Sequence, residues 1–263
     1  MKYRTIYPIT AANINAAYRL TIDALLNFHE SSVARYMTTL NVAAFDVQKE
    51  DKTWVISEIN VELPAPPVMW SEDVEITLWV SEMSPLRVWI DWEAKEVHTG
   101  VVAAHGNSCW SLISMSDRKL VSCEGFIPSS EIVDELTIGP HKKRIALKLS
   151  DEPISTIGHT INLIDLDFNG HTNNRRYINL ALICFDEGFL RRFRPDSLNI
   201  KFLKESRMGD SISNYTYATE DSSTYVGKAM NGSGEELCRV VSHWREKEVL
   251  PDIAEVNFVR NPY

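Results

Sequence analysis

The densest run of functional side chains in the sequence is DLDFNGHTNN, at residues 165–174. Asp167, Asn169 and His171 stand two residues apart in this run, directly before an apolar segment with helical spacing. A carboxylate and an imidazole can move protons, and an amide can hold water or a carbonyl group. Backbone N–H groups at the start of a helix can stabilise negative charge on a reacting oxygen. The run therefore indicates acid–base chemistry at a helix N-terminus.

Calcium binding and a purely structural turn are the two alternatives for this run. The order D-x-D-x-N-G opens an EF-hand loop, but the twelfth position is Arg176 instead of a bidentate Glu. An arginine there would repel the ion, so no metal site is expected. Asp and Asn are also common in turns and at helix N-caps. We favour a functional interpretation because so many groups of catalytic type converge before one helix.

The chain contains one pattern of elements twice: a short strand, a polar loop, an apolar helix and then strands only. In the first half we predict a helix from about Leu20 to Val33 and strands at 5–9, 53–61, 74–80, 86–93 and 105–113. In the second half we predict a helix from Ile178 to Phe189 and strands at 161–164, 197–203, 211–218, 222–230 and 235–246. A curved antiparallel sheet that wraps a central helix is the hotdog fold. The sequence therefore predicts an α+β double hotdog.

Three anchors align the two halves, and the sequence offset between them shrinks as expected if the second copy has shorter loops. They are Tyr18 with Tyr177, Asp73 with Asp210, and Trp110 with Trp244. The predicted domains are an N-terminal repeat at residues 1–145 and a C-terminal repeat at residues 150–263. A polar and basic linker is expected from about Gly139 to Pro153.

The pattern Asp167-x-Asn169-x-His171-x-Asn173-Asn174-x-x-Tyr177 resembles the signature of the acyl-acyl carrier protein (acyl-ACP) thioesterases, whose plant members terminate fatty-acid synthesis. The double-hotdog layout extends the resemblance over nearly the whole chain. The segment Lys204-Glu205-Ser206-Arg207-x-Gly209-Asp210 lines up with the family's second catalytic segment, in which a Glu is followed by Cys. Ser206 stands at that Cys position here. The resemblance implies release of free fatty acid from acyl carrier protein (ACP), without a cofactor.

Ser206 argues against a Cys-His-Asn mechanism, because a hydroxyl is a far weaker nucleophile than a thiolate at neutral pH. The sequence also lacks a G-x-S-x-G elbow, which removes the α/β-hydrolase route to a serine nucleophile. The remaining chemistry is carboxylate-assisted attack of water on a thioester. The division of labour between the two candidate carboxylates and the role of Ser206 stay open at this point.

From this remaining chemistry we assign the catalytic roles as a hypothesis. Glu205 and Asp167 are the candidate carboxylates, one as general base on water and the other aligning it or its partners. Asn169 holds the water or the thioester, and His171 orients the reacting groups or protonates the leaving thiolate. Backbone N–H groups near Thr172 to Asn174 are expected to face the thioester oxygen.

One active site per chain is expected, because the first half lacks this polar set. The residues before Asn15 are Ala11-Ala12-Asn13-Ile14, without a carboxylate or a histidine, and Glu205 corresponds to Val68. The N-terminal repeat is therefore predicted to serve as scaffold and acyl-chain chamber, and the C-terminal repeat to carry the catalytic residues.

A local excess of positive charge follows the motif. Residues 175–207 contain eight basic and four acidic residues, in a chain whose formal net charge is −9. A solvated surface and a docking site for the acidic ACP both explain such an excess. The predicted docking residues are Arg175, Arg176, Arg191, Arg192 and Lys204.

The composition predicts a soluble, cytoplasmic, globular protein. Hydrophobic residues make up 44% of the chain, but no apolar run approaches the roughly 20 residues that span a bilayer. The acidic balance disfavours nucleic acid as a main partner. Four cysteines without CxxC spacing are typical of reduced thiols.

Three rivals to an acyl-ACP thioesterase remain from the sequence. A hotdog acyl-CoA thioesterase shares the chemistry but binds a nucleotide handle. A non-catalytic acyl-binding hotdog protein would not need two carboxylates near a thioester. A hotdog dehydratase, with its usual histidine and single carboxylate, fits the cluster less well. The oligomeric state is open, and two chains could still pair as a homodimer.

Overall fold

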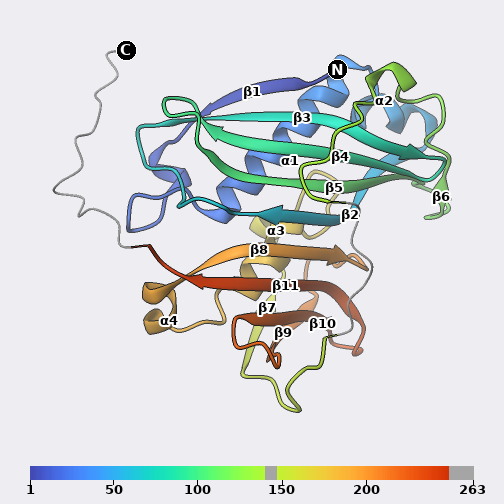
Figure 1. Ribbon diagram of the computed structural model, residues 1–263. Coiled ribbons are helices and arrows are strands. Elements are labelled where there is room, and N and C mark those ends of the chain that lie inside the picture. Colours follow the sequence, from blue (N-terminus) through green and yellow to red (C-terminus); the bar gives the residue numbers. More distant parts are fainter. Residues whose placement is uncertain (140–146, 249–263) are drawn as a thin grey trace. The chain divides into compact units, whose positions relative to one another are not determined.

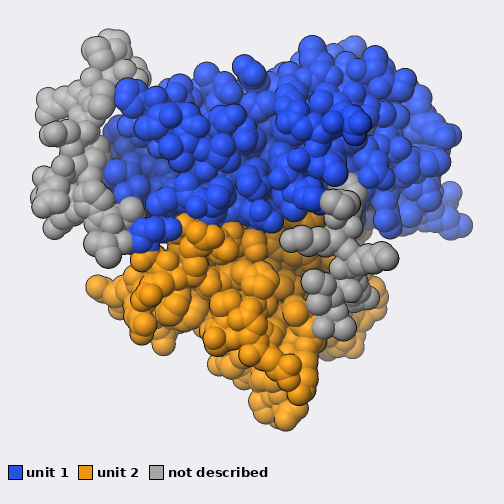
Figure 2. All heavy atoms as spheres, in the orientation of Figure 1, with its two compact units in different colours: residues 1–57, 61–140, 248–263 blue, residues 58–60, 141–247 orange. Residues whose placement is uncertain are grey.

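The computed structural model describes residues 1–139 and 147–248, and these form two compact units. Unit 1 contains residues 1–57 and 61–139, and unit 2 contains residues 58–60 and 147–247 (Figure 2). The predicted linker from Gly139 to Pro153 lies partly outside the described residues. The division places the whole of the DLDFNGHTNN run and Glu205 in unit 2.

Unit 1 is an antiparallel sheet with one long helix (Figure 1). Its main elements are β1 (Tyr3–Pro8), α1 (Ile22–Thr39), β2 (Lys52–Glu62), β3 (Asp73–Ser84), β4 (Arg87–Glu96) and β5 (Val102–Ser114). The strand order is β1-β3-β4-β5-β2, and the short β6 (Leu120–Val121) pairs with β5. Short helical segments η1 (Ala11–Asn13) and α2 (Ala44–Val47) lie on either side of α1. The predicted strands and helix of the first half are confirmed.

Helix α1 begins where a side chain can satisfy its first backbone donors. The Thr21 side chain accepts a hydrogen bond from the Ala24 N–H at 3.1 Å, and Asp23 adds negative charge in the first turn. Leu26 and Tyr36 are fully buried, and the helix packs on β1 and β3. An apolar stripe along 18 residues thus covers one face of the unit 1 sheet.

Unit 2 has the same plan on a smaller scale. Its main elements are β7 (Ser155–Thr160), α3 (Asn174–Leu182), α4 (Glu187–Arg192), β8 (Phe193–Phe202), β9 (Ser211–Ala218), β10 (Thr224–Asn231) and β11 (Glu236–Glu246). The strands are antiparallel in the order β8-β11-β10-β9-β7, and α3 packs on β9, β10 and β11. Two units, each with antiparallel strands and a central helix, make the chain an α+β double hotdog, as predicted.

Two predicted elements of unit 2 are wrong in extent. Residues 161–164 are not a strand, because Asn162 and Asp165 cap each other across the short 3-10 helix η4 (Leu163–Asp165). The second helix does not run unbroken to Phe189. It ends at Leu182, and the Asp186 side chain accepts a hydrogen bond from the Phe189 N–H at 2.7 Å and so starts α4.

The internal repeat is real, but one of its predicted anchors is wrong and one is off by a residue. Trp110 and Trp244 are confirmed as equivalents, since each indole N–H donates to the serine two residues before it, at 2.8 and 2.9 Å. Tyr18 is equivalent to Gly170 and not to Tyr177. The Tyr18 N–H donates to the Asn15 carbonyl, three residues before it, and the Gly170 N–H donates to the Asp167 carbonyl in the same way. The equivalent of Asp210 in the first repeat is Glu72 and not Asp73. The Asp210 carbonyl accepts from the Ile161 N–H, and the Glu72 carbonyl accepts from the Ile9 N–H.

Candidate active site

The loop that joins β7 to α3 is closed by the Asp167 side chain. Its Oδ1 accepts hydrogen bonds from the backbone N–H groups of Asn169 at 2.8 Å and His171 at 3.1 Å. The Asp167 N–H donates to the His171 carbonyl at 2.7 Å, and the turn between them needs the positive φ of Gly170, +75°. Asp167, Asn169 and His171 are therefore brought together by one hydrogen-bonded turn.

The fourth predicted residue, Glu205, lies beside His171. The His171 Nε2 atom is 3.4 Å from a Glu205 carboxylate oxygen, with the imidazole 16% exposed and the Glu205 side chain 38% exposed. The segment after β8 is held along the loop by a β-bridge between His171 and Arg207 and by the Thr172 N–H, which donates to the Ser206 carbonyl at 2.9 Å. A carboxylate and an imidazole thus meet at a partly exposed site, where a proton can pass between them and water.

Arg207 was not among the predicted site residues, yet it contacts the same imidazole nitrogen. Its Nη2 atom lies 3.4 Å from His171 Nε2. A guanidinium only donates hydrogen bonds, so this contact requires an unprotonated Nε2, whereas the Glu205 contact requires a protonated one. The two neighbours therefore favour opposite proton positions on His171.

Ser206 is buried and does not face the imidazole. Its Oγ atom hydrogen-bonds to Thr172 Oγ1 at 2.6 Å and to the Tyr177 hydroxyl at 2.7 Å. Burial raises the pKa of Tyr177, against the effect of its hydrogen bonds to Ser206 and Thr172, and so keeps that hydroxyl neutral. Both partners are neutral hydroxyls, and neither can act as a base on Ser206. The serine ties the Glu205 segment to Thr172 and to Tyr177 of α3.

Asp165 anchors the loop and was missed as a functional candidate. It is 3% exposed, and its carboxylate contacts His159 Nε2 at 2.8 Å, the Asn162 N–H at 2.9 Å and Arg176 Nε at 3.2 Å. Burial opposes its ionisation, but the hydrogen bonds from Asn162 and His159 and the charges of His159 and Arg176 together lower its pKa. The capping pattern Asn162-x-x-Asp165 was the available sequence signal.

Two of the three backbone amides expected to stabilise an oxyanion are used inside the loop. The Thr172 N–H donates to Ser206 and the Asn173 N–H donates to the Asp165 carbonyl at 2.8 Å. They hold the loop against α3 and the neighbouring segment, so the expectation is wrong for these two groups. Asn174, at the first position of α3, supplies the remaining amide of the trio.

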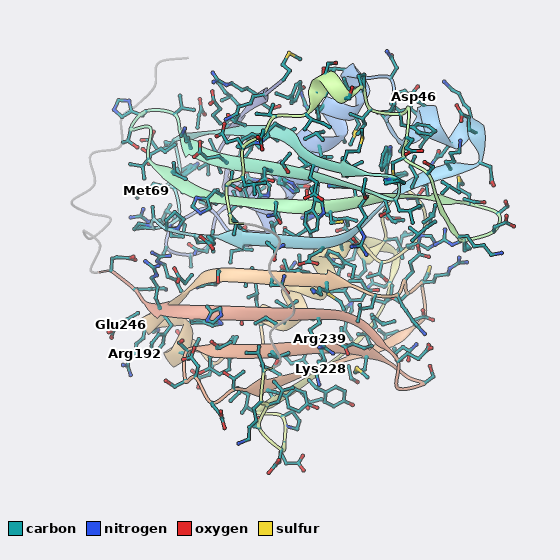
Figure 3. The ribbon with its side chains drawn as sticks, turned by 45° about the vertical axis from the view of Figure 1, so that its right-hand side comes forward. Asp46, Met69, Arg192, Lys228, Arg239 and Glu246 are labelled. Atoms are coloured by element: carbon teal, nitrogen blue, oxygen red, sulfur yellow. The ribbon has the colours of Figure 1, made fainter. Side chains whose placement is uncertain are left out.

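The predicted docking residues are largely engaged with acidic side chains. Arg191 pairs with Glu187 at 2.6 Å, and Arg192 lies 3.8 Å from Glu246. Arg192 and Glu246 are labelled in Figure 3. Two more pairs join Lys204 to Glu235 and Arg176 to Asp165. The Arg175 N–H donates to the Asn173 side chain at the start of α3. A count along the sequence overstates the positive charge, because several partners come from distant segments.

The remaining chemistry of the described chain is limited. Within residues 1–139 and 147–248, no cluster of three or more His, Cys, Asp or Glu side chains is placed to hold a metal ion. Cys109, Cys123, Cys184 and Cys238 are free thiols, and burial raises the pKa of the last three. None of the described helices is both long enough and apolar enough to span a bilayer.

Comparison with known proteins matches both repeats to one family. The model of the acyl-ACP thioesterase N-terminal domain matches residues 1–128, and that of the C-terminal domain matches residues 151–246. The chain is 22% identical over 260 residues to acyl-[acyl-carrier-protein] hydrolase FATB2, chloroplastic, of Cuphea viscosissima, covering 93% of this chain. It spans 63% of that relative's length.

Solved structures have the same fold. An acyl-ACP thioesterase from Bacteroides thetaiotaomicron superposes with a TM-score of 0.82 at 21% identity, covering 93% of this chain and 98% of the other. The 12:0-ACP thioesterase from Umbellularia californica gives 0.81 at 19% identity, covering 94% and 98%. With two domain models that together span most of its length, the chain belongs to the acyl-ACP thioesterase family.

Proposed function

We propose that the chain hydrolyses the thioester of fatty acyl-ACP and releases free fatty acid and ACP. The observation that carries this proposal is the contact between His171 and Glu205 beside the turn that holds Asp167 and Asn169. Family membership supports the reaction class, and the named relative from Cuphea viscosissima is an acyl-ACP hydrolase. Location in the cytoplasm, absence of a cofactor and the pairing of chains stay predictions.

Glu205 is the general base in the proposed mechanism. Asp167 already accepts two backbone hydrogen bonds through Oδ1 and thereby shapes the loop. Glu205 is partly exposed and contacts the imidazole, so it can take a proton from water as the water oxygen bonds to the thioester carbon. The carbonyl becomes an oxyanion, which the Asn169 amide and the Asn174 N–H can stabilise.

The second half of the proposed reaction belongs to His171. When the oxyanion collapses, the carbon–sulfur bond breaks and the sulfur takes its electron pair. His171, protonated by way of Glu205, then donates its proton to this sulfur and regenerates the neutral imidazole. Fatty acid and the free thiol of the carrier leave. Water supplies both the new hydroxyl of the acid and, through Glu205 and His171, the thiol proton.

Thiol release from matched acyl-ACP and acyl-CoA substrates over several chain lengths tests the proposal. We expect fast turnover of acyl-ACP, weak turnover of acyl-CoA, and a loss of about 10²-fold or more in kcat for Glu205→Gln. Glu220→Gln, at the exposed pair with Lys148, is the matched control and should keep wild-type turnover. Preference for acyl-CoA would make the chain an acyl-CoA thioesterase. Silence on both substrates with a folded sample would favour an acyl-binding protein.

A further inference from the structure

Large apolar side chains are exposed around the catalytic loop. Leu163 is 72% exposed, Ile164 75%, Phe168 78% and Met208 64%. Phe168 lies between Asp167 and Asn169, and Met208 follows Arg207, which forms the β-bridge with His171. We call these four residues the apolar rim. Single exposed apolar residues are common, but four beside one site point to a binding surface.

The first repeat shows that the fold does not require the apolar rim. The matching hydrogen bonds of the two loops make Ala11, Ala12 and Ala16 the equivalents of Leu163, Ile164 and Phe168. All three alanines are exposed as well. The same backbone is therefore built with methyl groups in one repeat and with large apolar side chains in the other.

The fourth rim position differs in a second way. Trp70 is the equivalent of Met208, and it stacks on Tyr18 with ring centroids 5.8 Å apart. Gly170 takes the place of Tyr18 in the second repeat, so no ring from that position covers Met208. Of the two loops, the one that carries the candidate catalytic residues therefore exposes more apolar surface, since Tyr18 and Trp70 of the first loop are each 38% exposed and Phe168 and Met208 are 78% and 64% exposed.

Cationic groups accompany the apolar rim. The Arg176 guanidinium donates to the Ile164 carbonyl at 3.0 Å and pairs with Asp165 through Nε, and its side chain is still 40% exposed. The exposed Arg207 directly precedes Met208. Apolar contacts beside positive charge suit an acidic protein with an apolar strip. A bilayer or a second copy seated on the apolar rim would cover the approach to His171 and Glu205. A carrier seated there would instead bring its own thioester to them.

We propose that Leu163, Ile164, Phe168 and Met208 form the docking surface for the acidic carrier protein that bears the acyl chain. The inference rests on the proposed function and names how the carrier is recognised. Apolar burial supplies affinity at this surface, while the basic residues orient the encounter. Because apolar contacts are not screened by salt, the contribution of the apolar rim to affinity should persist at high ionic strength.

The test truncates rim residues to alanine, which is the residue that the first repeat has at the positions of Leu163 and Ile164. Leu163→Ala with Ile164→Ala, and separately Met208→Ala, are compared with wild type in binding to ACP that carries an amide-linked, hydrolysis-resistant acyl chain. Turnover of acyl-ACP and of acyl-CoA with the same chain is measured alongside. We expect about tenfold weaker carrier binding, with KM for acyl-ACP rising and the ratio of kcat/KM for acyl-ACP to that for acyl-CoA falling similarly. Leu120→Ala and Val97→Ala, exposed residues of unit 1, are the matched controls.

The outcomes separate this proposal from the proposed function. Wild type that binds the amide-linked carrier but hydrolyses neither substrate would remove the hydrolase and leave the docking surface standing. Unchanged carrier binding in the rim variants would overturn the docking surface. Equal losses of kcat/KM on acyl-ACP and acyl-CoA would also overturn the docking surface. If the rim variants instead changed the sedimentation coefficient, the rim would be a contact between two copies of the chain. If they instead lost binding to anionic phospholipid vesicles, the rim would be a membrane contact.

Discussion

The loops before α1 and α3 share one backbone and differ in their chemistry. Asn15 and Asp167 occupy equivalent positions, and the side-chain oxygen of each accepts from the N–H groups two and four residues further on. These distances are 2.9 and 3.1 Å in the first loop, and 2.8 and 3.1 Å in the second. The turn therefore requires an acceptor oxygen, which an amide supplies as well as a carboxylate does. The negative charge of Asp167 is an addition that the fold does not demand.

The other candidate catalytic positions differ more strongly. Ala17 and Arg19 replace Asn169 and His171, and Pro67 replaces Glu205, which corrects the predicted match of Glu205 with Val68. The Arg19 guanidinium donates to the Pro67 carbonyl at 3.1 Å. It thus contacts the residue that stands where Glu205 stands in the second repeat. The first loop retains the architecture and lacks every group needed to move a proton to or from water. Comparison of the loops thus separates residues that shape the site from residues that react.

The helices above the loops are packed differently. His29 of α1 and Ala181 of α3 each stand eight residues after the N-cap, and they face Trp92 of β4 and Gly227 of β10. The His29 and Trp92 rings lie 4.8 Å apart, whereas a Cβ added at Gly227 would lie 3.0 Å from the Ala181 Cβ. One contact uses two rings and the other uses two small residues. Helix α3 therefore lies close to its sheet at this contact.

Exchanging the residues at the head of each loop should give the largest effect. Asp167→Asn places the first-repeat residue in the second loop, keeps the acceptor oxygen and removes the charge. We expect stability within about 1 kcal/mol of wild type, because the two backbone hydrogen bonds remain. We expect a loss of about 10²- to 10⁴-fold in kcat, because the predicted role of the carboxylate that is not the base is to align the attacking water or its partners. Urea unfolding and thiol release measure the two quantities.

The reverse exchange is its control. Asn15→Asp should leave kcat within about twofold, because no imidazole or second carboxylate stands near it in the described first loop. Near-normal turnover of Asp167→Asn would show that Asp167 has only the structural role that Asn15 has.

The close packing of α3 predicts the next effect. Gly227→Ala places a methyl group against Ala181, so α3 must give by a few tenths of an ångström, and we expect about 2 kcal/mol lower free energy of unfolding. Movement of α3 carries the His171 loop with it and should also lower kcat. Gly158→Ala in β7 meets no atom within 4 Å and is the control. A Gly227→Ala protein as stable as wild type would mean that the contact can accommodate a methyl group and that the loop is positioned independently of it.

His29 makes the free energy of unfolding of the first repeat depend on pH. Ala181, at the equivalent position of the second repeat, cannot titrate. Burial lowers the pKa of His29 to about 3, while the unfolded chain takes up this proton near pH 6.5. The free energy of unfolding should therefore fall by about 1.4 kcal/mol per pH unit below pH 6.5, and level off near pH 3. His29→Phe keeps a ring against Trp92 and should remove this part of the slope in urea unfolding between pH 6 and 5. An unchanged slope would assign the acid sensitivity to other groups.

The sequence predicted what local patterns encode. Alternation of β-branched and aromatic residues placed the strands of both repeats, and the D-x-N-x-H spacing placed three site residues in one turn. Alignment by residue type alone was wrong for Tyr18 and Tyr177, because these two residues do not make equivalent backbone hydrogen bonds. Asp165 escaped notice because its partners His159 and Arg176 come from a strand and a helix on either side of the loop. The salt bridges of Lys204 and Arg192 join distant segments and leave no local signal.

The smallest effect is expected at Ser206, where the second repeat departs from the family pattern and the first has Val68. Ser206→Cys introduces a thiol between the Thr172 and Tyr177 hydroxyls, where burial keeps it protonated and away from His171. We expect kcat for acyl-ACP to change by less than about threefold, since only weak hydrogen bonds replace stronger ones. Ser206→Ala leaves both hydroxyls without this partner and should cost about 1–2 kcal/mol of stability with a similarly small change in kcat.

Alkylation shows whether the introduced thiol takes part in the reaction. Iodoacetamide should inactivate Ser206→Cys no faster than wild type, whose own four cysteines provide the background. A tenfold rise in kcat together with rapid inactivation would mean that position 206 reaches the thioester. The water mechanism with Glu205 as base would then give way to a covalent acyl-enzyme. Because the Ser206 Oγ contacts only neutral hydroxyls, whereas Glu205 contacts the imidazole, we expect the carboxylate and not residue 206 to set the rate.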